Sequence, residues 1–129
     1  MQCIVVTPEA PVVDQPADFV ALTLFDGEIG VAPDHTPLIG RLGYGEMRIT
    51  DAGKTERYYI EGGFVEVVGN VVTVLTNRAV PAEQIDEAVV EEQLRSAQAR
   101  PARTPESMAV RDRAVEQCRA QLRVARRAE

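Results

Sequence analysis

The stretch that decides the fold is Phe64-Val65-Glu66-Val67-Val68-Gly69-Asn70-Val71-Val72-Thr73-Val74-Leu75-Thr76. Valine and other apolar or β-branched residues dominate both halves, as is typical of strands. Gly69-Asn70 stands between the halves, and both residues tolerate the positive φ of a tight turn. The stretch therefore predicts a β-hairpin.

The preceding residues repeat this pattern of short strands and turns. Residues 20–25 alternate and are followed by Asp26-Gly27, a strong hairpin-turn signal. Residues 44–50 alternate up to a turn at 51–54, and residues 55–61 are rich in aromatic and β-branched types. Short, closely spaced strands with glycine turns predict an antiparallel sandwich or barrel.

The composition changes after Pro81. Residues 82–100 are rich in Glu, Gln and Ala and contain neither Gly nor Pro, which favours a helix. Prolines 101 and 105 interrupt that helix, and Thr104 is suited to cap a second one from about Glu106 to Arg126. Two helices joined by a short loop lie antiparallel.

The predicted fold is thus an all-β N-terminal sandwich over residues 1–82 and an α-helical hairpin over residues 83–129. The apolar stripe expected on the second helix consists of Met108, Val115, Cys118, Leu122 and Ala125. The first helix has a thinner stripe of Ile85, Ala88, Val89 and Ala97. Small side chains bury little apolar area, so we expect the hairpin to dock weakly and to open.

The charge distribution limits the classes of partner. The chain has 129 residues and a net charge of −6, but residues 106–129 carry six arginines against four acids. An acidic body argues against nucleic acid, which requires a basic surface. The basic last segment suits an acidic protein surface, or it is simply a solvated helix face. Neither a membrane span nor a signal peptide is evident, which predicts a cytoplasmic protein.

The sequence offers little for catalysis. His35 is the only histidine, and no Ser or Cys lies in a recognisable nucleophile motif. Cys3 and Cys118 lie far apart and are expected to be ordinary packed thiols, with no metal site. The Gly-rich positions 43–45 and 62–63 are expected to form turns and bulges rather than phosphate loops. A hydrolase using His35 and nearby acids is the weakest hypothesis.

Four segments together resemble a known family. They are Ile4-Val5-Val6-Thr7-Pro8-Glu9, Asp26-Gly27-Glu28-Ile29-Gly30-Val31-Ala32-Pro33-Asp34-His35-Thr36-Pro37-Leu38, Gly62-Gly63-Phe64-Val65-Glu66-Val67 and Val71-Val72-Thr73-Val74-Leu75-Thr76-Asn77-Arg78-Ala79. In this order and spacing they resemble the epsilon subunit of the F-type ATP synthase. The likeness spans nearly the whole chain.

The resemblance implies a non-catalytic role in rotation. Members of this family bind the gamma subunit in the central stalk, sit on the ring of c subunits and couple proton or sodium flow to ATP synthesis. Their helical tail can extend toward the alpha/beta head and inhibit ATP hydrolysis. The implied location is the cytoplasmic side of the bacterial inner membrane, as a peripheral part of the complex.

The resemblance also implies roles for individual residues. Glu28, Asp34 and His35 match the region that meets the c ring, although His35 is equally well explained as a turn residue with local hydrogen bonds. Arg119 and Arg123 match the basic face that the inhibitory tail sets against an acidic segment of a beta subunit.

One motif departs from the family. Some bacterial members bind ATP on the folded hairpin through Ile/Leu-Asp-x-x-Arg-Ala. Ile85 and Asp86 match that motif, whereas Val89 and Val90 replace Arg and Ala. Without the guanidinium we expect weak or no ATP binding and therefore no cofactor. Asp86 then serves the helix dipole as an acid in the first turn.

An alternative function from another class is a free-standing ligand-binding β-sandwich with a helical dimerisation tail. The two hypotheses differ in partner: the first predicts binding to gamma, the second self-association and a small ligand.

Overall fold

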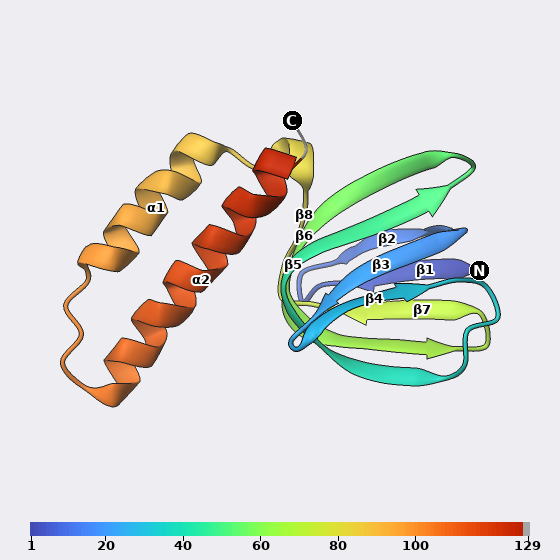
Figure 1. Cartoon of the computed structure of the whole chain (residues 1–129), viewed down its shortest axis with the longest axis horizontal. Coiled ribbons are helices and arrows are strands. Elements are labelled where there is room, and N and C mark those ends of the chain that lie inside the picture. Colours follow the sequence, from blue (N-terminus) through green and yellow to red (C-terminus); the bar gives the residue numbers. More distant parts are fainter. Residues whose placement is uncertain (128–129) are drawn as a thin grey trace.

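The computed structural model describes residues 1–127 and places two helices beside a β-sandwich (Figure 1). The eight strands are β1 (Gln2–Val6), β2 (Pro11–Pro16), β3 (Phe19–Leu24), β4 (Gly27–Val31), β5 (Leu38–Asp51), β6 (Lys54–Val68), β7 (Val71–Leu75) and β8 (Ala79–Pro81). They form one continuous path, β2-β1-β7-β6-β5-β3-β4, with β8 paired to β6. The β1–β7 pair is parallel, and the other pairs are antiparallel.

Two long strands, β5 and β6, run through both layers of the sandwich. One half of β6 pairs with β7 from Phe64 to Val68, and the other half pairs with β8 from Tyr58 to Ile60. The sequence predicts separate strands at 55–61 and 64–68, and this separation is wrong. Gly62 and Gly63 have φ values of 68° and 101°, so they bend the strand without ending its pairing with β5.

The core lies between the two layers and is built by alternation along the strands. Its fully buried side chains include Val5, Leu22, Val31, Met47, Ile49, Val65, Val67, Val72 and Val74. Cys3 is also wholly buried there, as expected of a thiol that packs as a small hydrophobe. The alternation explains why the predicted β-hairpin at 64–76 has the observed register: the odd valines of β6 and the even ones of β7 point inward.

The chain leaves the sheet through η1 (Ala82–Gln84) and then forms α1 (Glu87–Ala99) and α2 (Pro105–Arg127). The first helix begins later than the composition from Ala82 onward suggests. Asp86 is its N-cap, and the Asp86 carboxylate accepts a hydrogen bond from the Val89 amide at 3.3 Å. Thr104 precedes α2 as predicted, and its hydroxyl accepts a hydrogen bond from the Ser107 amide at 3.1 Å.

Helix α2 lies between α1 and the sandwich (Figure 1). On one side, Ala120 and Val124 pack against Tyr59. On the other side, Cys118 and Leu122 pack against Val90 of α1. This double contact buries two sides of the last turns of α2 and leaves the arginine side exposed, whereas a single apolar stripe predicts one buried side.

The predicted stripes are right at the buried Ala97, Cys118, Leu122 and Ala125 and wrong at three other positions. Val89 and Met108 are 50% and 44% exposed, while the neighbouring Val90 is buried. Ala88 is exposed as well. The later start of α1 at Glu87 shifts its buried face, whereas the contact of α2 with two neighbours widens its buried face near the C-terminus.

Within residues 1–127, neither helix has the length and apolar character needed to cross a membrane.

Candidate docking groove and helical tail

The outer face of the sandwich is covered along part of β6 and bare along the rest. Tyr58, Tyr59 and Ile60 are buried in succession because the core covers one face and α2 covers the other. Beyond Gly63 the strand alternates between buried and exposed side chains. This uncovered face carries the candidate site.

A row of exposed side chains crosses three strands on this face. Arg41 of β5 pairs directly with Phe64 of β6, which pairs with Leu75 of β7. Phe25, at the β3–β4 turn, extends the row, since the Arg41 guanidinium lies 5.7 Å from its ring centroid. Phe25, Phe64 and Leu75 are 65%, 57% and 52% exposed. The row is thus a contiguous apolar strip with one cation in it.

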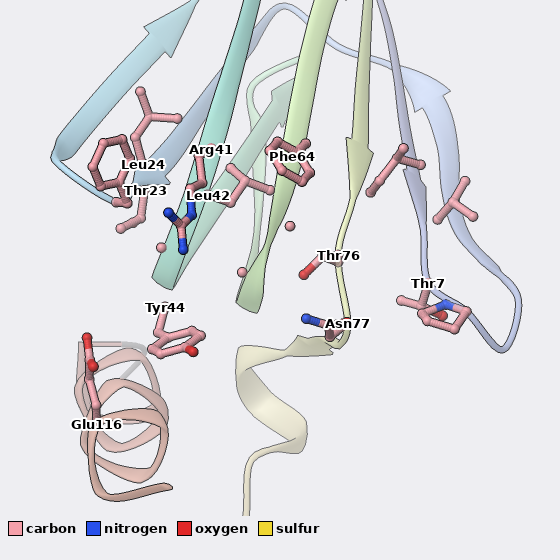
Figure 2. A pocket seen from close by; sticks show the side chains of 17 residues that line it. Thr7, Thr23, Leu24, Arg41, Leu42, Tyr44, Phe64, Thr76, Asn77 and Glu116 are labelled. Carbon is pink, nitrogen blue, oxygen red and sulfur yellow. The ribbon is translucent and has the colours of Figure 1, made fainter. Parts of the chain in front are cut away.

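The strip borders an open groove of about 1200 Å³. Figure 2 shows Arg41, Leu42 and Phe64 above the groove, Thr76 and Asn77 on one side, and Tyr44 with Glu116 of α2 at the other. The helical tail therefore contributes to the wall of a groove that belongs mainly to the sandwich.

Backbone geometry fixes the shape of the groove. Gly63 lines it with φ of 101°, and a Cβ at this position would lie 1.8 Å from the Leu75 carbonyl oxygen. The glycine thus allows β6 and β7 to approach closely where the strand bends. Exposed aromatic rings beside an exposed guanidinium are features of protein-docking surfaces.

The residues expected at the c ring lie elsewhere. Asp34 and His35 belong to the loop between β4 and β5. The Asp34 amide donates to the Asn70 side-chain oxygen at 2.6 Å, and the Asn70 amide group donates to the Asp34 carboxylate at 2.9 Å. These two bonds attach the loop to the β6–β7 turn, and Asp34 itself has φ of 65°.

His35 makes a local contact. Its Nδ1 lies 2.6 Å from the Thr36 carbonyl oxygen, and because a carbonyl only accepts, Nδ1 carries the proton. This hydrogen bond is the local turn interaction that the sequence left open as an explanation of His35. Its existence leaves the role of the histidine at an interface untested.

Glu28 is not clustered with the loop. It lies at the start of β4, exposed and opposite Thr23, while the loop begins after Val31 at the other end of that strand. Three residues of strand span about 10 Å. The structure thus brings Asp34 and His35 together and sets Glu28 apart along one edge strand.

The residues expected in the helical tail fall into two groups, exposed arginines on α2 and residues that pack or cap at the start of α1. Arg119 and Arg123 are exposed on α2. Of the residues that match the ATP motif, Ile85 packs against both the apolar cluster around Tyr59 and the one around Val90. The Asp86 carboxylate is occupied by the N-cap hydrogen bond of α1. At the two positions where the sequence differs from the ATP motif, Val89 is exposed and Val90 is buried.

A buried carboxylate joins the sandwich to the end of α2, and sequence reasoning missed it. The Glu46 side chain is 3% exposed; it accepts a hydrogen bond from Arg48 at 2.7 Å and pairs with Arg57, while Arg127 lies 4.0 Å away. Burial alone would raise the pKa of Glu46. Hydrogen bonds from Arg48 and Arg57, with the charges of Arg57 and Arg127, outweigh burial and lower that pKa.

Two further ion pairs, also missed, join the two helices. Arg126 donates to the Glu87 carboxylate at 3.2 Å and to the Glu91 carboxylate at 2.9 Å. Helical spacing places Glu87 and Glu91 on one face, which is a signal for a shared cation. Which cation reaches them depends on how the two antiparallel helices are aligned, and no local sequence pattern predicts that alignment.

The comparisons with known proteins agree with this fold. A profile described as ATP synthase, Delta/Epsilon chain, beta-sandwich domain matches residues 1–82. The ATP synthase epsilon chain of Rhodopirellula baltica is 46% identical over 126 residues, which cover 98% of this chain and 98% of that relative. The chain belongs to the family of ATP synthase epsilon chains.

Other epsilon chains and solved structures extend the likeness. The epsilon chain of Carboxydothermus hydrogenoformans is 46% identical over 77% of this chain and 74% of its own length. A chain of the Euglena gracilis mitochondrial ATP synthase superposes with a TM-score of 0.83 at 25% identity, covering 95% of this chain and 79% of that one.

A chain from the Tetrahymena thermophila mitochondrial ATP synthase central stalk and c ring has a TM-score of 0.70 at 12% identity, over 96% and 95% of the two chains. At that identity the match supports the fold alone. Membership in the epsilon family makes the chain a subunit of an ATP synthase and confirms the resemblance that its motifs indicate.

Proposed function

We propose that this epsilon chain is the non-catalytic coupling subunit of a rotary ATP synthase and that it binds the gamma subunit through the strip Phe25, Arg41, Phe64 and Leu75. The observation that carries the proposal is this uncovered apolar strip on the outer face of the sandwich, beside the part of that face that α2 covers. An apolar core with one cation is a common composition for an interface.

The same proposal assigns the c-ring contact to the β4 edge and the following loop. Glu28 is exposed, and the loop of Asp34 and His35 is held by two hydrogen bonds to Asn70. A pre-ordered loop loses little conformational entropy on binding, which favours a contact that has to persist under rotation. Proton or sodium flow through the ring would then be transmitted to gamma through the sandwich. The chain would work as a peripheral subunit on the cytoplasmic side of the bacterial inner membrane.

The helical tail is proposed to regulate hydrolysis. Exposed Arg119 and Arg123 would meet an acidic surface of the alpha/beta head when α2 leaves the sandwich. The occupied Asp86 carboxylate and the valines at 89 and 90 support the expectation that the folded hairpin does not bind ATP tightly.

A binding experiment tests the gamma contact. Purified chain is titrated into the gamma subunit of the same complex by isothermal titration calorimetry. We expect Phe64→Asp to weaken binding by roughly 30-fold, because a central aromatic side chain commonly contributes about 2 kcal/mol to an interface.

Val68→Asp is the matched control. Val68 lies on the same face of β6, is 49% exposed and does not line the groove. We expect it to bind gamma as the wild type does. Equal weakening by both variants would contradict the assignment of the strip, and no binding of gamma by the wild type would contradict the proposed function.

A further inference from the structure

Helix α1 is held in place by few apolar contacts. Within the described residues, its buried side chains are Val90 and Ala97, and it packs chiefly on α2 rather than on the sheet (Figure 1). At the loop end, residues 100–105 are mostly exposed. Apolar burial therefore stabilises the closed hairpin only modestly, so that even weak polar contacts at its other end change how often it opens.

Those polar contacts converge on the last turn of α2. The Arg126 side chain is 55% exposed and bridges Glu87 and Glu91, whose side chains are 34% and 43% exposed. Both carboxylates belong to the first turns of α1. One guanidinium thus joins the end of α2 to the beginning of α1, at the end of the hairpin opposite its connecting loop.

The helix dipoles reinforce this contact. The C-terminus of α2 carries partial negative charge and the N-terminus of α1 partial positive charge, and the antiparallel arrangement places them side by side. Arg126 and Glu87 each stand at the helix end that favours their sign. The pair is therefore favourable with respect to both dipoles when the hairpin is closed.

The next residue extends the contact to the sandwich. Arg127 lies 4.0 Å from the buried carboxylate of Glu46, which already binds Arg48 and Arg57. Two successive arginines thus connect one helical turn to the other helix and to the sheet.

We propose that this last turn is an ion-pair latch: Arg126 closes α1 on α2, Arg127 holds the same turn near Glu46, and ionic strength sets how often the hairpin opens. Exposed ion pairs are weak and are screened by salt, so the latch changes the population of open hairpin by a small factor. The regulatory use of the latch rests on the proposed function, whereas the latch itself is a property of the isolated chain.

The two cysteines provide the readout. Cys118 is buried between the helices at 7% exposure, and Cys3 is wholly buried in the sandwich core. Opening of the hairpin exposes Cys118, while Cys3 becomes reactive when the sandwich unfolds. Labelling of the full-length chain with N-ethylmaleimide, resolved by peptide mass spectrometry, separates the two events. Rates are divided by those of the urea-unfolded chain at the same salt.

We expect Arg126→Ala to accelerate labelling of Cys118 by about two- to fivefold at low ionic strength. In the wild type, raising the NaCl concentration from about 20 mM to about 500 mM should produce a similar acceleration, which Arg126→Ala should largely abolish. Glu91→Gln added to Arg126→Ala should change the rate less than Glu91→Gln alone.

Arg119→Ala is the matched control. Arg119 lies two turns earlier on the same face of α2, is exposed and forms no ion pair with another residue among 1–127. It should label as the wild type does. The latch is refuted if Arg126→Ala and Arg119→Ala label alike, if the salt response survives Arg126→Ala, or if Cys3 reacts as fast as Cys118 in the wild type. A failure to bind gamma would leave these results unchanged.

Discussion

At the scale of single residues, Glu46 shows how a charge is accommodated where sheet and helix meet. Arg48 and Arg57 lie directly opposite each other on β5 and β6, an arrangement that is unfavourable for two like charges. The Glu46 carboxylate binds both and is itself almost completely buried. Removing it would leave two facing guanidinium groups without a counter-charge.

We therefore expect Glu46→Gln to lower the free energy of unfolding by about 2 kcal/mol at neutral pH. The folded-state pKa of Glu46 lies below its ordinary value of 4.5. Its stabilising effect is thus present above that value and is lost as the pH falls through the lowered pKa. Urea denaturation should show the difference between wild type and variant shrinking toward zero in acid. The exposed Glu66→Gln should show no such difference at neutral pH, and a pH-independent difference for Glu46→Gln would contradict the assignment.

Substitutions at Gly63 and Gly69 distinguish the cost of a positive φ from the cost of a steric clash. Both have positive φ, but a Cβ at Gly63 would collide with the Leu75 carbonyl, while a Cβ at Gly69 has nothing within 4 Å. We expect Gly69→Ala to cost about 1 kcal/mol and Gly63→Ala at least about 3 kcal/mol in thermal or urea unfolding. Equal costs would show that the bend in β6 relaxes easily.

At the scale of elements, α1 depends on its cap because its packing is thin. Asp86 matches a nucleotide motif in sequence, yet in the structure its carboxylate accepts the Val89 amide. The composition of residues 82–100 predicts a helix but not its beginning, which the cap position decides. Its buried face is set by contact with α2 and was predicted wrongly at Val89.

We expect Asp86→Ala to destabilise the first turn of α1 by about 1 kcal/mol, while Asp86→Ser keeps the cap and remains close to wild type. Amide hydrogen exchange at Val89 and Val90 should report the loss. Protection that is lower in both variants would show that the negative charge matters rather than the hydrogen bond.

At the scale of the whole molecule, local signals predicted the sandwich, its hairpins and the two helices. They did not give the pairing of β1 with β7, because this parallel partner is distant in sequence. The docking strip was missed for the same reason: Phe25, Arg41, Phe64 and Leu75 become neighbours through strand register. The motifs that carry the family resemblance combine strand residues with turn and bend residues, among them glycines and prolines that backbone geometry constrains.

The continuity of β5 and β6 has a mechanical consequence. Because both strands pass through the two layers without a break in their mutual pairing, the sandwich contains a single ribbon that ties its layers covalently. A force along this ribbon loads its ladder in shear, so that many hydrogen bonds resist together, whereas a force across the ribbon would peel them one at a time. The sandwich is therefore expected to resist a pull along this ribbon more strongly than a pull that separates its two strands.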